Sequence, residues 1–142
     1  MKNIFNKSLL VLGSVFVVIQ FIGTDKINPE ITAELSAPPE IKMIFKSSCY
    51  DCHSNQTKWP WYSYVAPVSW LVARDVKEGR EHLNFSEWGN YNSEDMLDIK
   101  REIWEEIKKG NMPMKIYTYL HGDAVLSAED KASIKKWALE QE

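Results

Sequence analysis

The sequence predicts an all-α domain preceded by an apolar helix at the N-terminus. Apolar residues recur with the period of a helix in several stretches, and helix start and stop signals flank those stretches. No segment shows the alternating apolar and polar pattern of a half-buried strand. With 142 residues, 44% of them apolar, the chain is long enough for one domain of ordinary size and a short extra segment.

The N-terminal segment, residues 1–23, has the pattern of an export signal. Lys2 and Lys7 form a basic start, and the nearly continuous apolar run of residues 9–22 follows. The run is shorter than the ~20 residues that cross a bilayer, which favours a signal peptide. The residues after it lack a small-x-small cleavage site, and we favour an uncleaved anchor with its lysines on the cytoplasmic side. Either way, we expect the rest of the chain on the periplasmic side of the inner membrane.

Residues 24–38 are polar and contain Pro29 and Pro38, so we expect a tether between the membrane and the domain of residues 39–142. The formal net charge of −3 and the lack of a basic run argue against a nucleic-acid partner. Beyond Lys2 and Lys7 the chain is more acidic, which would suit docking on mildly basic protein partners.

The first helix of the domain is expected to begin at about Pro39, because proline fits a first helical turn. Its apolar stripe consists of Ile41, Ile44 and Phe45. A second helix is expected to begin at about Pro67 and to weaken at Gly79. Its expected inner face consists of Val68, Leu71, Val72 and Val76.

A loop over residues 84–90 separates the second helix from a third, which Ser93 is expected to cap and Gly110 to end. The apolar positions of the third helix are Met96, Ile99, Ile103, Trp104 and Ile107. Ser127 is expected to cap the last helix. Its inner face consists of Ile134, Trp137 and Ala138. Residues 59–62 and 111–114 are expected to be non-helical.

Both cysteines of the chain lie in the pentapeptide Cys49-Tyr50-Asp51-Cys52-His53. This is the C-x-x-C-H pattern of covalent haem attachment. Each thiol can add to one vinyl group of the same porphyrin, and the adjoining His53 is then carried to the proximal position on iron. A bare C-x-x-C also suits a redox dithiol, half a zinc site or a disulfide. The adjoining histidine, the lack of a second cysteine pair and the export signal favour one covalently attached haem c.

A six-coordinate haem iron needs a second axial ligand, usually a methionine sulfur or another imidazole. We favour Met112, because it follows a helix stop and precedes Pro113 in extended chain. Met114 competes, since residues two apart in an extended chain point in similar directions. His121, His82 and an open site are the alternatives.

The aromatic residues Trp59 and Trp61 lie close to the attachment motif in sequence. They are expected to wall one haem edge or cover a propionate, and an aromatic knot in the core is an equally good interpretation. Met43 and Met96 lie in helical segments and are expected in the core.

Several short stretches occur in a fixed order along the chain. They are residues 48–55, 59–63, 66–70, 79–80 and 83–88, then the Met112-Pro113 turn, His121, Leu126-Ser127 and Trp137. In these stretches the sequence resembles the small haem-binding domain family of bacterial c-type cytochromes. The resemblance implies a cytochrome-c-like helical domain around one covalent haem held by Cys49, Cys52 and His53. The family usually has Met-Pro-Pro where this chain has Met112-Pro113-Met114.

The leading functional hypothesis is a mono-haem c-type cytochrome that carries electrons between redox partner proteins, rather than an enzyme. We find no paired carboxylates in a pocket-like context, no nucleophile motif and no phosphate loop in the sequence. One alternative is a peroxidase-like haem enzyme whose open distal side uses His82, His121 or Arg80. Another is a haem-based sensor or an assembly subunit.

Overall fold

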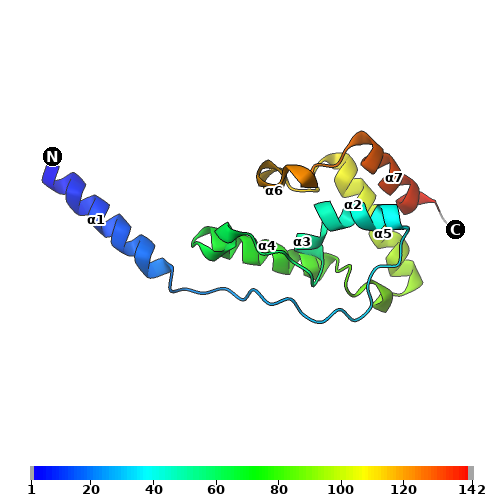
Figure 1. Ribbon diagram of the computed structural model, residues 1–142, viewed down its shortest axis with the longest axis horizontal. Coiled ribbons are helices and arrows are strands. Elements are labelled where there is room, and N and C mark those ends of the chain that lie inside the picture. Colours follow the sequence, from blue (N-terminus) through cyan, green and yellow to red (C-terminus); the bar gives the residue numbers. More distant parts are fainter. Residues whose placement is uncertain (1, 141–142) are drawn as a thin grey trace.

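The structure, a computed structural model, describes residues 2–140, and these residues form helices and no strand. The predicted all-α class is therefore confirmed. Figure 1 shows α1 projecting from the body that the other helices form, with an extended segment between them. The α-helices are α1 (Lys2–Ile19), α2 (Pro39–Ser48), α3 (Tyr50–His53), α4 (Val68–His82), α5 (Ser93–Lys109), α6 (Lys115–Leu120) and α7 (Ala128–Leu139). The 3-10 helices are η1 (Trp61–Tyr64), η2 (Trp88–Asn90) and η3 (Gly122–Ala124).

Helix α1 is the expected apolar helix, and its large apolar side chains are exposed from Ile4 to Val18. Among the described helices, none combines the length and the apolarity needed to cross a membrane. The chain just after α1 is bonded to the domain, because the Gln20 side chain donates to the carbonyl and accepts from the N–H of Ala66.

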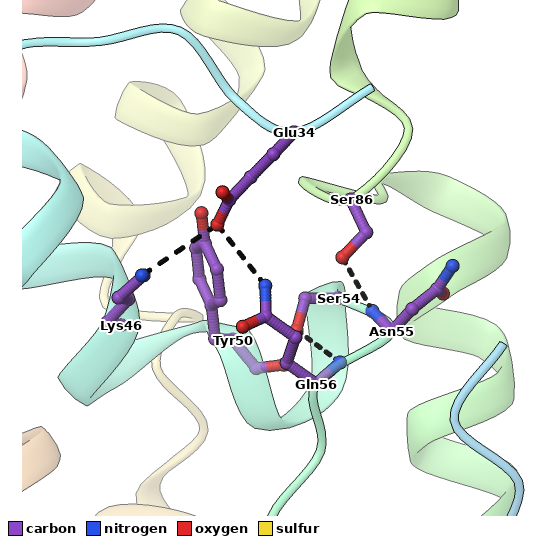
Figure 2. A network of polar contacts seen from close by, with 7 residues as sticks. All are labelled: Glu34, Lys46, Tyr50, Ser54, Asn55, Gln56 and Ser86. Atoms are coloured by element: carbon purple, nitrogen blue, oxygen red, sulfur yellow. Dashed lines mark hydrogen bonds and ion pairs between the residues drawn. The ribbon is translucent and has the colours of Figure 1, made fainter. Parts of the chain in front are cut away.

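Residues 24–38 join α1 to α2, and their second half is also part of the domain. The N–H groups of Thr32 and Ala33 donate to the carbonyl of Ser86, and Leu35 N–H donates to Phe85 O at 2.8 Å. The Leu35 side chain is fully buried. Figure 2 shows Glu34 of this segment above Tyr50, paired with Lys46 and accepting a hydrogen bond from Gln56.

The core forms where α2 and α7 meet the loop between α4 and α5. The predicted stripe of α2 is buried, and the Phe45 ring stacks on Phe85, with 4.8 Å between centroids, and meets the edge of Trp137. Met96 packs against this core as expected. Met43 does not, since it lies on the other side of α2 and is 67% exposed.

The helix ends agree with the sequence signals except at the start of α5. Asn92, and not Ser93, is the N-cap, because its side chain accepts a hydrogen bond from the N–H of Asp95. Gly110 ends α5 in the left-handed conformation, with φ of 75°. Ser127 caps α7 as predicted, within a capping box.

Helix α4 follows Pro67 as predicted but continues past Gly79 to His82. Of its expected inner face Val76 is buried, whereas Val68 and Leu71 are exposed. Several short elements were not expected from the sequence. The expectation that residues 59–62 are non-helical is wrong at its end, since η1 begins at Trp61. The others are η2, which lies inside the expected loop of residues 84–90, and α6 and η3, which follow residue 114.

Candidate functional site

A cavity of about 770 Å³ lies between α3, α4, α5 and the segment of residues 112–117. This volume falls within the range of roughly 300–1,000 Å³ typical of cofactor pockets. Ile99, Ile103 and Ile107, which recur every four residues on α5, line one wall. Leu83 and Phe85 also line it. Three of the five predicted apolar positions of α5 therefore line the cavity.

The attachment motif forms another wall of this cavity. Cys49 ends α2, and its carbonyl accepts hydrogen bonds from the N–H groups of Cys52 and His53. This single helical turn brings both cysteines and His53 to the cavity lining. Both thiols are free. Burial, with the charge of Cys52 adding to it, raises the pKa of Cys49 to about 12, and burial raises that of Cys52 to about 11.

The His53 ring is oriented by the backbone of α4. Its Nδ1 lies 2.9 Å from the carbonyl oxygen of Gly79 and 3.3 Å from that of Leu83. Because both neighbours are acceptors, Nδ1 carries the proton and Nε2 keeps its lone pair. Burial lowers the pKa of His53, which favours this neutral form. A neutral imidazole with its Nδ1–H held by a carbonyl is the usual arrangement of a metal-binding histidine.

Helix α4 reaches His53 because it passes very close to α3. A Cβ atom on Gly79 would lie 2.7 Å from the carbonyl oxygen of Cys52, so a side chain at this position does not fit. The next residue, Arg80, forms hydrogen bonds with the loop that follows α3 and with residues 27–28. Its guanidinium donates to Ser54 O, Thr57 Oγ1, Asn28 Oδ1 and Ile27 O.

Three of the four candidates for the second axial ligand line the cavity. Met112, Met114 and His82 reach it together with His53. His121 lies elsewhere: its Nε2 is 2.7 Å from the Tyr62 hydroxyl, and its ring stacks on Tyr117.

Neither tryptophan of the aromatic stretch lines the cavity. Trp61 is 79% exposed. Trp59 is half-buried, and its indole nitrogen is buried without a hydrogen-bond partner among the described residues. The structure therefore does not bring Trp59 or Trp61 to the lining that holds the motif.

Sequence reasoning missed Tyr117, which lines the cavity and joins α6 to the attachment motif on α3. The Tyr117 hydroxyl donates to Asp51 Oδ2 at 2.8 Å, and Asp51 is one of the two residues between the cysteines. Helix α6 is too short for a periodic pattern, and these two residues lie 66 positions apart, so no local signal indicates the contact.

The cavity lining also carries more acidic than basic side chains. Besides Asp51, the acidic members are Asp75, Glu78, Glu102, Glu105 and Glu106, and the basic ones are Arg101 and Lys109. Helix α5 thus contributes both isoleucines and charged side chains to the lining, and Asp51, Asp75 and Glu78 add acidic groups from α3 and α4.

These residues fit a haem. The cavity has a suitable size, an apolar wall, two thiols at haem-attachment spacing and an imidazole whose Nε2 is available to iron. The fold and the site thus define a small all-α haem-binding protein. The chain belongs to the haem-binding domain family, whose model matches residues 14–140. No curated protein and no solved structure matches the chain.

Proposed function

We propose that this chain is a mono-haem c-type cytochrome that carries electrons between redox proteins. The orientation of the His53 ring is the observation that supports the proposal best. Its Nδ1 is bonded to Gly79 O, which leaves Nε2 for iron in a cavity that two methionine side chains also line. Haem iron, when bound, supplies reversible one-electron chemistry, and methionine together with histidine ligation raises its reduction potential.

The residues of the cavity each have a distinct role in this proposal. Cys49 and Cys52 would hold haem c through two thioether bonds, and His53 would be the proximal ligand. The Nδ1–H···O bond to Gly79 fixes the ring orientation and makes Nε2 a stronger donor. The α5 isoleucines would give a bound haem apolar contacts on one side, and the apolar shell of a site is one way in which a protein tunes a reduction potential.

Met112 is our first choice as the distal ligand, with Met114 as its competitor. Both line the cavity, and both lie in the non-helical segment between α5 and α6. That segment is held at both ends, by the Gly110 helix stop and by the Tyr117–Asp51 hydrogen bond.

The partners of this carrier would be proteins with basic surfaces. Six acidic side chains line the cavity, against two permanently basic ones. Complementary charge speeds encounter and fixes orientation, and salt weakens both effects. We further propose that the domain works on the periplasmic side of the inner membrane and that α1 attaches it there.

The contacts of the polar residues favour a carrier over a peroxidase. A peroxidase-like site needs a polar group free to act over an open haem face. Arg80 donates to four acceptors outside the cavity lining, and His121 is paired with Tyr62. Of the three residues considered for that role, His82 alone lines the cavity.

The optical spectrum of the protein, made in a host that attaches haem, tests the proposal. We expect haem to stay with the polypeptide on acid extraction, and a low-spin spectrum with the far-red sulfur-to-ferric-iron band. Met112→Ala should abolish that band, whereas the matched changes Met114→Ala and His82→Ala should keep it. Extractable haem would contradict covalent attachment. A high-spin wild-type spectrum with ready carbon monoxide binding would contradict the carrier.

A further inference from the structure

The corner of the domain where η1 meets α4 exposes several large apolar side chains. They are Trp61 (79% exposed), Tyr64 (62%), Leu71 (51%) and Val68 (40%). Phe21 and Ile22, just after α1, are 85% and 55% exposed. We call these six residues the η1–α4 corner. Apolar side chains gathered in this way usually mark a contact surface.

The chain that leaves α1 is fixed to this corner by side-chain hydrogen bonds. Gln20 Oε1 accepts from Ala66 N–H at 2.9 Å, and Gln20 Nε2 donates to Ala66 O at 3.1 Å. The Trp70 indole N–H donates to Ile22 O at 3.2 Å. Two bonds from one side-chain amide to the backbone of one residue fix orientation as well as position. The chain that leaves α1 is therefore held beside the corner.

The length of α1 determines which layer of a bilayer the corner would reach. Its 18 residues rise about 27 Å, slightly less than the ~30 Å of hydrocarbon in a typical bilayer. Because α1 is not long enough to cross a bilayer, a bilayer into which its apolar residues insert would keep the residues directly after it in the interfacial layer. Tryptophan and tyrosine side chains prefer that layer. The Lys26 ammonium, 4.9 Å from the centre of the Tyr64 ring, suits anionic headgroups.

We propose that the η1–α4 corner is a second membrane-contacting surface, which rests in the interfacial phospholipid layer of the same bilayer that holds α1. This inference rests on the membrane attachment proposed above. The domain is then not free to rotate at the end of a tether. It keeps one orientation, and its haem cavity faces redox partners from a constant direction.

Photo-crosslinking in vesicles tests this surface directly. The full chain is reconstituted into vesicles of phosphatidylethanolamine and phosphatidylglycerol that contain a lipid with a diazirine near its headgroup. After illumination, mass spectrometry maps the labelled peptides. We expect label on α1 and on residues 60–72, and little on α2 and α7, although Met43 and Leu139 there are also exposed apolar residues.

Each other pattern of label overturns a different statement. Label on α1 alone overturns the corner as a lipid contact and leaves the membrane attachment standing. Label on α2 and α7 as strong as on residues 60–72 also overturns the corner, because contact would then be unspecific. Absence of label on α1 overturns the membrane attachment, and the inference falls with it.

A variant of the junction separates the corner from its attachment to α1. Gln20→Ala should reduce the label on residues 60–72 several-fold while α1 stays labelled, because the amide bridge to Ala66 is lost. Gln56→Ala is the matched control, since Gln56 bonds to Glu34 far from the junction. Unchanged corner label in Gln20→Ala would overturn the role of the bridge. Far-UV circular dichroism verifies that both variants are folded.

Discussion

Gly79 and Cys52 make the contact that sets the distance between the two helices on which the site is built. An ideal Cβ on Gly79 would lie 2.7 Å from Cys52 O. The missing side chain lets α4 approach α3, and the carbonyl of the same glycine then reaches His53 Nδ1 at 2.9 Å. One backbone position therefore spaces the helices and orients the imidazole.

Gly79→Ala should destabilise the fold and disturb haem binding. The added methyl meets backbone atoms, which cannot move aside as a side chain tip can, so we expect a loss of roughly 1–3 kcal/mol. Urea unfolding monitored by circular dichroism measures it. Gly122→Ala is the control and should change stability by less than about 0.5 kcal/mol, because nothing lies within 4 Å of its Cβ position. Equal effects of the two changes would contradict the helix contact.

Tyr117→Phe should loosen the segment between α5 and α6 that carries Met112 and Met114, without changing either methionine. The change deletes the hydroxyl that donates to Asp51, and about 1 kcal/mol of stability should be lost. In the haem-loaded protein, carbon monoxide should bind faster to the reduced form, because the methionine segment is held less firmly. Tyr119→Phe serves as control, since Tyr119 is 88% exposed. Identical carbon monoxide kinetics in both variants would refute the role of this contact.

Tyr117 should also make the fold sensitive to alkali. Burial, and then the hydrogen bond to Asp51, raise the pKa of Tyr117 above its ordinary value. A raised pKa in the folded state contributes stability that is present below the unfolded pKa, about 10, and is lost as pH rises beyond it. Denaturant unfolding across this range should show a steeper decline for the wild type than for Tyr117→Phe. Parallel curves would show that another group, such as Tyr50 with its pKa raised to about 12, causes the decline.

Arg80→Lys should be costly although it keeps the charge. The planar guanidinium serves four acceptors on the loop after α3 and on residues 27–28, and an ammonium cannot reach them all. We expect a loss of about 2–3 kcal/mol in urea unfolding. Arg74→Lys provides the comparison, because Arg74 makes exposed ion pairs and should lose less than about 0.5 kcal/mol. A small effect at Arg80 would mean that water replaces these bonds.

The helices that carry strong local signals could be predicted from the sequence. A proline start, an apolar stripe and a glycine or serine at the ends located α2, α5 and α7, and their burial follows the stripes. Local reasoning failed where two signals compete. Asn92 and Ser93 are both good caps, and the choice depends on which residue leaves the helical conformation.

Apolar periodicity identifies the apolar face of a helix but not what covers it. Ile99, Ile103 and Ile107 line the cavity as well as contacting the core, whereas Val68 and Leu71 remain exposed. The attachment motif could be predicted from the sequence because Cys49, Cys52 and His53 lie within five consecutive residues. Contacts such as Tyr62–His121 were not, because they join residues 59 positions apart through the fold.

The burial of Leu35 shows that the haem-binding unit begins before α2. This residue is fully buried, and its N–H is bonded to Phe85 O, although it lies ahead of α2. Further upstream, Ile27 O accepts from Arg80. Gln20 and Ile22 are bonded to Ala66 and Trp70 in the same way. The unit that could be transplanted onto another protein, or exchanged between proteins as a module, therefore begins at the end of α1. A graft that starts at Pro39 would leave an apolar hole and unpaired backbone groups at its seam.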